Sequence, residues 1–275
     1  RIDYSILNQH AESYRKIRNT FRFLLGNIRD EYEEYNFEDI EIDDLPELER
    51  FMLHRIAILD SNFHKYFKSY NFHSLYKELL NFCTVELSAF YFDIRKDLLY
   101  CDPVDSAKRS GCIKMLNIIL QCLIKWFAPI LSFTTEEVYK LLSSDKKNES
   151  IHLQNFVKIP KAWLDEIIAS RWDIIKKIRD EANISIESKR ASKEIGSSLE
   201  ADIQINLDNE LYNTVKEYDF AEICITSNAN IKSEKQIDKK IVVSTKKAKG
   251  EKCPVCWKLS QNPCKKHGHL LSNNE

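Results

Sequence analysis

The stretch SILNQHAESYRKIRNTFRFLLGNIR, residues 5–29, carries the pattern that decides the fold. Its apolar side chains recur at spacings of three and four, which is typical of an amphipathic helix. They are Leu7, Ala11, Tyr14, Ile17, Phe21, Leu24, Leu25 and Ile28. Arginines form a second stripe beside this face, namely Arg15, Arg18, Arg22 and Arg29. We therefore predict one long helix with an apolar face and a positively charged one.

Further long helices follow this first one. An acidic run over residues 30–49 comes next, and we interpret it as a solvated loop. It ends in a helix-start signal, because Pro46 is tolerated in the first turn of a helix that continues to about residue 70. Ser74 and Ser106 are predicted caps of two more helices, to about residues 99 and 127. Long helices with short connections predict an antiparallel bundle over residues 1–143.

The pattern changes after residue 143. Thr134 and Glu137 form a capping box that predicts a short last helix of the bundle, and the polar residues 143–150 are typical of a linker. A helix is expected over 162–185, a strand over 201–207 where apolar and polar residues alternate, and strands at 221–225 and 240–244. The predicted fold class is mainly α: a helix bundle, a small α+β junction domain over 151–247, and a zinc knuckle over 250–271.

Composition excludes several classes of site. The five glycines are scattered, so neither GxGxxG nor a P-loop is present. The histidines form no ligand or triad spacing outside the C-terminal cluster, and we find no catalytic constellation. No uninterrupted apolar run approaches the ~20 residues of a membrane span, so no membrane partner is expected. The net charge of -1 hides a basic end, because eleven lysines face four acidic residues from Ile231 onward.

A metal site is predicted near the C-terminus. Cys253, Cys256, Cys264 and His267 follow the pattern Cys-x2-Cys-x7-Cys-x2-His, and two such pairs supply the tetrahedral ligands of structural Zn²⁺. His269 is the rival fourth ligand, and free thiols in a disordered basic tail are the alternative. The other cysteines are scattered through apolar stretches, which fits a reducing, cytoplasmic compartment.

Nucleic-acid contacts are predicted at two places. The arginine stripe of the first helix offers phosphate contacts, although such a stripe is more often a solvated helix face. Trp257, beside Lys258 on the knuckle, is a stacking platform for an unpaired base. Its alternative role is to pack the small zinc module.

Five stretches together resemble one family. YRKIRNTFRFLLGNI (14–28) is similar to the opening helix of the anticodon-binding domain of isoleucyl-tRNA synthetases, of class Ia type. YFDIRKDLLYCDPVDSAKRS (91–110) and WFAPILSFTTEEVY (126–139) resemble later helices of that bundle. IRDEANISIESKRASKEIGSSLEADI (178–203) resembles the family's C-terminal junction, and GEKCPVCWK (250–258) the terminal zinc module of its bacterial type.

The resemblance implies that this chain is the C-terminal, tRNA-binding part of a ligase that attaches isoleucine to tRNA(Ile). ATP and Mg²⁺ would belong to a catalytic domain whose HIGH and KMSKS signatures do not occur here, so the fragment is expected to be inactive alone. We expect a cytoplasmic monomer that binds the anticodon stem-loop and carries structural zinc. The family's module usually ends in a second Cys-x2-Cys after a longer spacer, whereas here the last ligand is a histidine.

The same resemblance implies a set of contact residues. It places Arg15, Arg18, Asn19 and Arg22 on a bundle helix that binds the anticodon region, and Trp257 and Lys258 on the zinc module. Two alternatives from other classes remain: a free-standing RNA-binding adaptor, and a helical scaffold whose zinc knuckle binds protein.

Overall fold

The chain forms two compact units in the computed structural model, and each is described here by itself. The first unit comprises Arg1–Leu99 and Pro103–Asp165, and the second Tyr100–Asp102 and Glu166–Glu275. The structure describes residues 3–28, 31–142, 149–234, 240–261, 264 and 267.

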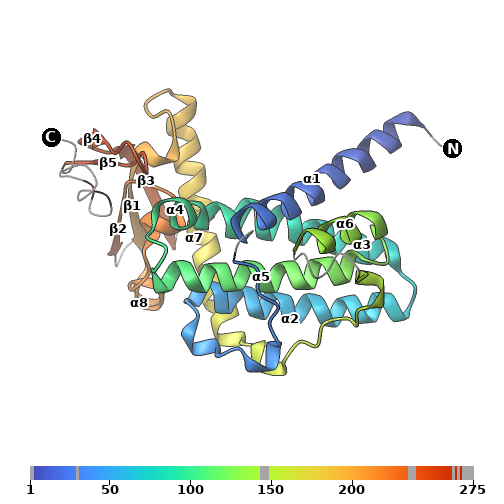
Figure 1. Ribbon diagram of the computed structural model, residues 1–275. Helices are drawn as coiled ribbons and strands as arrows, with labels where there is room; N and C mark the ends of the chain where they lie inside the picture. Colours follow the sequence, from blue (N-terminus) through green and yellow to red (C-terminus); the bar gives the residue numbers. More distant parts are fainter. Residues whose placement is uncertain are drawn as a thin grey trace. The chain divides into compact units, whose positions relative to one another are not determined.

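The first unit is a helix bundle (Figure 1). Its helices are α1 (Tyr4–Ile28), α2 (Glu47–Lys68), α3 (Phe72–Asn81), the π-helical η3 (Phe82–Phe92), α4 (Asp93–Cys101), α5 (Ala107–Phe127) and α6 (Ser132–Leu142). Short 3-10 turns lie at η1 (Phe37–Asp39), η2 (Ile42–Asp44), η5 (Ile151–Leu153) and η6 (Lys161–Trp163). α5 packs against α1, α2 and α6, and α1 also packs against η3. The predicted mainly α class, with a bundle ahead of a small mixed sheet, is confirmed.

α5 is the central helix of the bundle. It is long and apolar enough to cross a membrane by length and composition, yet 83% of its apolar window is buried inside the structure, as in the core helix of a bundle. Gly111 lets this helix approach the start of α2, because a Cβ there would lie 2.7 Å from Cδ of Pro46. The absence of a side chain at Gly111 therefore allows α5 to pack closely against the start of α2.

The acidic segment between α1 and α2 is not the solvated loop that its composition predicts. The side chain of Asn117 on α5 accepts a hydrogen bond from the backbone N–H of Glu33 (3.1 Å) and donates to the carbonyl of Glu31 (3.1 Å). One turn later, Gln121 accepts from the N–H of Tyr35 (3.2 Å) and donates to its carbonyl (3.3 Å). The side-chain amides of Asn117 and Gln121 thus hydrogen-bond the backbone of residues 31–35 and hold it alongside α5.

A buried ion pair crosses the bundle. The Arg95 guanidinium on α4 donates two hydrogen bonds to the Glu49 carboxylate on α2, at 2.7 and 2.6 Å, and Tyr91 adds a third at 2.9 Å. Glu49 is fully buried and Arg95 is 3% exposed. Sequence reasoning missed this pair, because the two residues lie 46 positions apart.

Helix starts in the bundle were predicted with mixed success. Ser106 caps α5 as predicted, and its side chain accepts from the N–H of Arg109. The cap predicted at Ser74 is wrong, because Asn71 caps α3 and accepts from the Ser74 N–H at 3.2 Å. The capping box predicted at Thr134 is also wrong, since α6 begins two residues earlier and this threonine lies inside the helix.

The second unit combines helices with two small sheets. Its elements are α7 (Glu166–Ala191), η7 (Ser198–Glu200), β1 (Ala201–Leu207), α8 (Asn209–Val215), α9 (Phe220–Ile223), β2 (Asn228–Ser233), β3 (Ile241–Lys247), β4 (Glu251–Lys252) and β5 (Leu259–Ser260). The larger sheet has the order β2-β1-β3, with β1 parallel to β2 and antiparallel to β3. β1 buries alternate residues, and α7 packs against β1 and β3.

One predicted strand of this unit is wrong, and one strand was missed. Residues 221–225 fall on the end of α9 and the turn after it, and the Asp219 side chain accepts hydrogen bonds from the N–H groups of Ala221 (2.9 Å) and Glu222 (3.1 Å). A capping carboxylate at this position selects the helical turn over a strand. β2 was missed because its sequence NANIKS shows little apolar alternation.

Candidate metal centre and nucleic-acid interface

The hairpin of β4 and β5 presents the first two cysteines on one tight turn. The N–H of Cys253 donates to the carbonyl of Lys258, and the N–H of Trp257 donates back to the carbonyl of Cys253, both at 2.9 Å. Gly250 precedes the hairpin with φ of +111°, and a Cβ there would lie 1.9 Å from the Ser260 carbonyl oxygen. Only glycine fits this position, so the local sequence sets the shape of the turn.

The structure brings the four predicted ligands together. The ligand atoms of Cys253, Cys256, Cys264 and His267 all lie within 4.8 Å of one another. His267 Nδ1 is 3.6 Å from Cys253 Sγ and 3.4 Å from Cys264 Sγ, and the sulfurs of Cys256 and Cys264 are 3.7 Å apart. Tetrahedral Zn²⁺ with ordinary bond lengths sets edges of about 3.8 Å between sulfurs and about 3.5 Å between sulfur and nitrogen. The donor set therefore fits a zinc ion in both chemistry and spacing.

His267 is oriented by a contact on its other ring nitrogen. Nε2 lies 3.2 Å from the carbonyl oxygen of Cys101, which belongs to the same compact unit. A proton on Nε2 donates to this carbonyl and leaves Nδ1 unprotonated toward the thiols, as is usual for a metal-binding imidazole. The rival ligand His269 lies outside the described residues.

The two thiols of the turn differ in acidity. Burial raises the pKa of Cys256 to about 12. Burial acts on Cys253 in the same direction, but the backbone N–H groups of Cys256 and Val255 outweigh it and lower the pKa of Cys253 to about 7. This lowered pKa favours the thiolate, which is the form that binds a metal.

The scattered cysteines behave as core residues. Burial raises the pKa of Cys83, Cys112 and Cys224 to about 12, so these thiols stay protonated at neutral pH. They pack as small apolar side chains in the interior of the unit to which each belongs.

Trp257 is displayed on the surface of its unit. Its side chain is 58% exposed, and the Lys252 ammonium lies 5.3 Å from the centre of its ring. Lys258, the other predicted contact of this module, is half-buried beside it. An exposed indole with a cation over one face can stack on a base and meet its phosphate.

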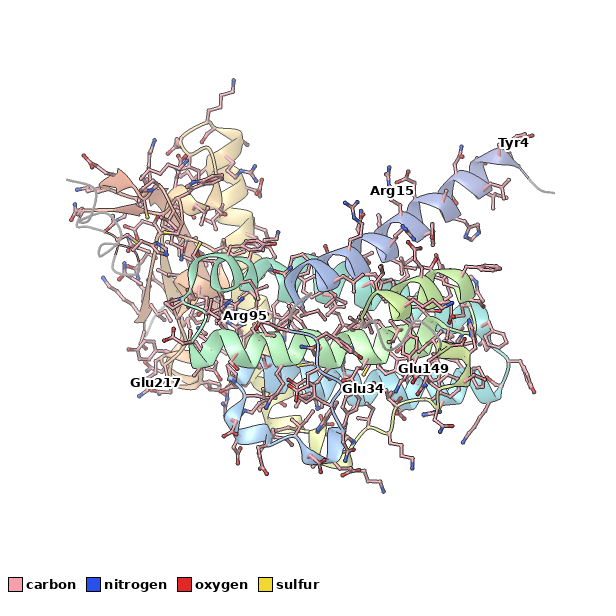
Figure 2. All side chains as sticks on the ribbon, viewed as in Figure 1. Tyr4, Arg15, Glu34, Arg95, Glu149 and Glu217 are labelled. Carbon is pink, nitrogen blue, oxygen red and sulfur yellow. The ribbon has the colours of Figure 1, made fainter. Side chains whose placement is uncertain are left out.

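The predicted contacts on α1 occupy different surroundings. Arg15 projects from α1 and is paired with Glu12, both exposed (Figure 2). Arg18 donates two hydrogen bonds to Glu137 on α6, each at 2.8 Å, and this pairing lowers the pKa of the Glu137 carboxyl. Arg22 is exposed, and among the residues that the structure describes it has no ion-pair partner. Asn19, exposed between them, lines a cavity.

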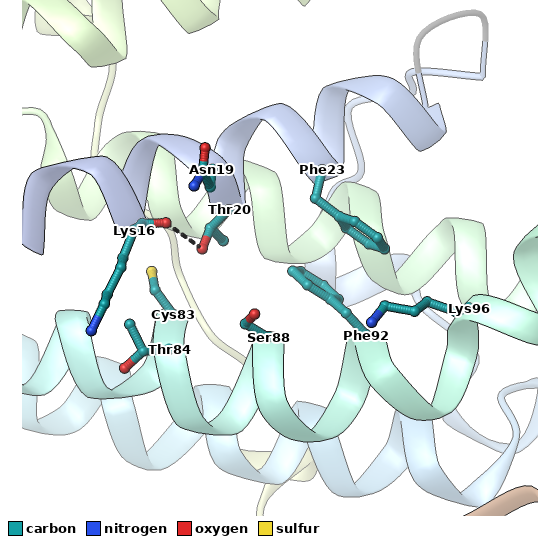
Figure 3. A pocket seen from close by; sticks show the side chains of 9 residues that line it. All are labelled: Lys16, Asn19, Thr20, Phe23, Cys83, Thr84, Ser88, Phe92 and Lys96. Carbon is teal, nitrogen blue, oxygen red and sulfur yellow. Dashed lines mark hydrogen bonds between the residues drawn. The ribbon is translucent and has the colours of Figure 1, made fainter. Parts of the chain in front are cut away.

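That cavity lies between α1 and η3 and was not expected from the sequence (Figure 3). Its volume is about 440 Å³, and it is bounded by lysines, hydroxyl groups and a pair of phenylalanine rings. The sequence signal for this cavity is the helical spacing of four residues on α1, namely Lys16, Asn19, Thr20 and Phe23. That spacing forms a pocket only because η3 lies opposite α1.

Comparisons with known proteins give one consistent result. Residues 49–207 match the family model described as the anticodon-binding domain of tRNA ligase. The chain is 59% identical over 267 residues to an isoleucine–tRNA ligase of Pelagibacter ubique, covering 97% of this chain and 29% of that protein. It is 39% identical over 269 residues to the protein of that name from Agrobacterium fabrum, covering 94% and 27%. The Bartonella henselae protein of that name is 37% identical over 272 residues, covering 95% and 27%. The chain thus spans less than a third of these relatives' length.

Proposed function

This chain belongs to the family of anticodon-binding domains of tRNA ligases, and from that premise we propose that it binds the anticodon stem-loop of tRNA(Ile). The observation that carries the proposal is the similarity along almost the whole chain to isoleucine–tRNA ligases. The exposed cations of α1 and the exposed Trp257 supply the chemistry that RNA binding needs. The comparisons give no support to the adaptor or scaffold alternatives.

The proposed zinc is structural. Three thiolates and one imidazole supply all four ligands of a tetrahedral ion and leave no position for substrate. The ion would neutralise the thiolates and hold the β4–β5 hairpin together with Cys264 and His267, so that Trp257 and Lys258 face RNA in one fixed arrangement.

The chemical steps of the proposed ligase are assigned to other parts of the enzyme. Activation of isoleucine with ATP and Mg²⁺, and its transfer to tRNA(Ile), would take place in a catalytic domain. We propose that this chain acts in the cytoplasm, as part of a monomeric enzyme, and ligates nothing when isolated.

The direct test is RNA binding by the zinc-loaded chain across a salt series. The two RNAs are tRNA(Ile) and the same tRNA with an altered anticodon. Preference for the isoleucine anticodon would support anticodon recognition by these residues. Equal, steeply salt-dependent binding would mean that the chain supplies charge and position only. No binding to either RNA would contradict the proposal.

Arg22→Ala is expected to weaken tRNA binding and to lower the slope of log K against log salt by about one unit, as for one lost phosphate contact. Arg22 is the arginine of the stripe whose charge is not committed to an ion pair among the described residues. Lys161→Ala is the matched control, because it removes an exposed charge from η6 in the same unit. Equal effects of the two variants would indicate that the arginine stripe is a solvated helix face that does not contact RNA.

Glu137→Gln is expected to strengthen tRNA binding severalfold and to make the salt dependence steeper. The substitution removes the negative charge that pairs with Arg18 and leaves the amide oxygen to accept only one of the two hydrogen bonds. Filter binding of the same tRNA at two salt concentrations measures both effects. Weaker binding would show instead that Glu137 holds Arg18 in its binding position.

A further inference from the structure

The cavity between α1 and η3 is built from three kinds of group. Lys16 stands at one end, and Phe23, Phe92 and Lys96 stand at the other (Figure 3). The two rings are stacked, with centroids 4.2 Å apart and planes 21° apart, and Phe92 is buried while Phe23 is half-buried. The rings face each other, so together they close one end of the cavity with apolar surface.

The polar groups of the cavity have unused hydrogen-bonding capacity. The Thr84 hydroxyl donates to the carbonyl of Leu80 at 2.8 Å, which leaves its oxygen able to accept a further hydrogen bond. The buried Thr20 hydroxyl donates to the carbonyl of Lys16 at 3.2 Å and also interacts with the Cys83 thiol. The Asn19 amide makes no hydrogen bond among the described residues, so it offers donors and an acceptor together. Ser88 adds an exposed hydroxyl from η3.

The opposite wall has an uncommon backbone. η3 is π-helical over Phe82–Phe92, eleven residues within an otherwise α-helical rod. π-helical turns are rare and occur frequently at functional sites. Here the π-helical segment supplies Ser88, Thr84 and Phe92 to the cavity.

The charges around the cavity favour an anionic group. Lys16 has no ion-pair partner among the residues that the structure describes, while Lys96 pairs with Asp93 at 3.0 Å. Asn19 lies three positions before Arg22 and four after Arg15, so it shares their helix face, and it also lines the cavity. An RNA backbone held by the arginines would pass the mouth of the cavity.

We propose that this cavity takes up one unstacked base of the bound RNA. The base lies against the apolar end formed by Phe23 and Phe92, Asn19 reads its hydrogen-bonding edge, and Lys16 meets the adjoining phosphate. Single-stranded RNA is commonly recognised in this way, by splayed bases on aromatic side chains and polar groups at their edges. This assignment rests on the proposed function, and it identifies the cavity as a part of the chain that recognises a base.

The test pairs a cavity-filling variant with RNA that lacks one base. Ser88→Trp fills the cavity from an exposed position, and Ala89→Trp places the same side chain on the neighbouring exposed residue, which does not line it. The probes are the tRNA(Ile) anticodon hairpin and a set of hairpins with one abasic loop nucleotide each. Circular dichroism melting checks that each variant is folded.

The native chain should lose about tenfold in affinity at one abasic position, the usual value of one base stacked on an aromatic side chain. Ser88→Trp should bind the intact hairpin about tenfold more weakly and show no further loss at that position. Ala89→Trp should match the native chain. Asn19→Ala, a smaller change, should remove base discrimination at the same position and leave the salt slope unchanged.

Two results would overturn the assignment. The first is native affinity for the intact hairpin in Ser88→Trp, which would show that no base enters the cavity. The second is an affinity loss from Ser88→Trp that adds to the loss from the abasic nucleotide at every loop position, which would show that the two changes act independently. Both results keep RNA binding intact, so they separate this assignment from the proposed function. Failure of the native chain to bind any hairpin would remove both together.

Discussion

Arg95→Met is expected to lower the free energy of unfolding by about 3–5 kcal/mol, the usual cost of removing one partner from a buried ion pair. The Glu49 carboxylate is fully buried and receives two charged hydrogen bonds from Arg95, so the variant leaves a buried charge with Tyr91 as its remaining donor. This loss is a large share of the ~5–15 kcal/mol that a domain has in total. Urea unfolding followed by circular dichroism measures it.

Two variants control this experiment. Arg15→Met breaks an exposed pair on α1, whose side chains are 68% and 57% exposed, and should change stability by less than about 1 kcal/mol. Glu49→Gln combined with Arg95→Met removes the stranded charge and should recover much of the loss. A loss below about 1 kcal/mol in Arg95→Met alone would contradict the expected role of this pair.

Removal of zinc is expected to unfold the knuckle while the bundle stays folded. Structural zinc sites of this size contribute on the order of 10–16 kcal/mol of apparent binding free energy, which is folding free energy for the module. Hydrogen exchange should show loss of protection over 251–260 after chelation, with α5 unaffected. Atomic absorption should find one zinc per chain before chelation, and its absence would contradict the proposed site.

Variants of the fourth ligand sharpen this test. His267→Ala should weaken zinc binding, because one of the four donors is removed and the buried Cys101 contact is lost with it. His267→Cys should restore a tetrahedral site, and Co²⁺ substitution should show the changed ligand set in the visible spectrum. Native zinc affinity in His267→Ala would indicate a different fourth ligand.

Sequence patterns correctly predicted the features that depend on residues close together in the chain. The long helix α1 follows from apolar spacing, and the start of α5 from the cap at Ser106. The grouping of Cys253, Cys256, Cys264 and His267 follows from the reach of two short-spaced pairs, because each pair holds its ligands on one turn. In each case the residues that matter lie within one short stretch of the chain.

Features that depend on distant residues were missed. Glu137 was interpreted as part of a cap, but in the structure it pairs with Arg18, 119 positions away. The short apolar run at 221–225 fits a strand or a helix equally well by periodicity, and a single carboxylate at Asp219 decides for the helix. The cavity requires α1 and η3 to face each other, which no local pattern contains.

The amide clasp of α5 on residues 31–35 also sets an order of events during translation. Asn117 lies 84 positions after its partner Glu33, so the ribosome must add those residues before the clasp can close. At about 5–20 residues per second, this wait lasts roughly 4–17 seconds. During that time the surfaces of α1 and α2 that pack against α5 lack this partner, because α5 is still being made. We therefore expect ribosome-bound chaperones to bind nascent chains that end before Phe127 and to release them once α5 is complete.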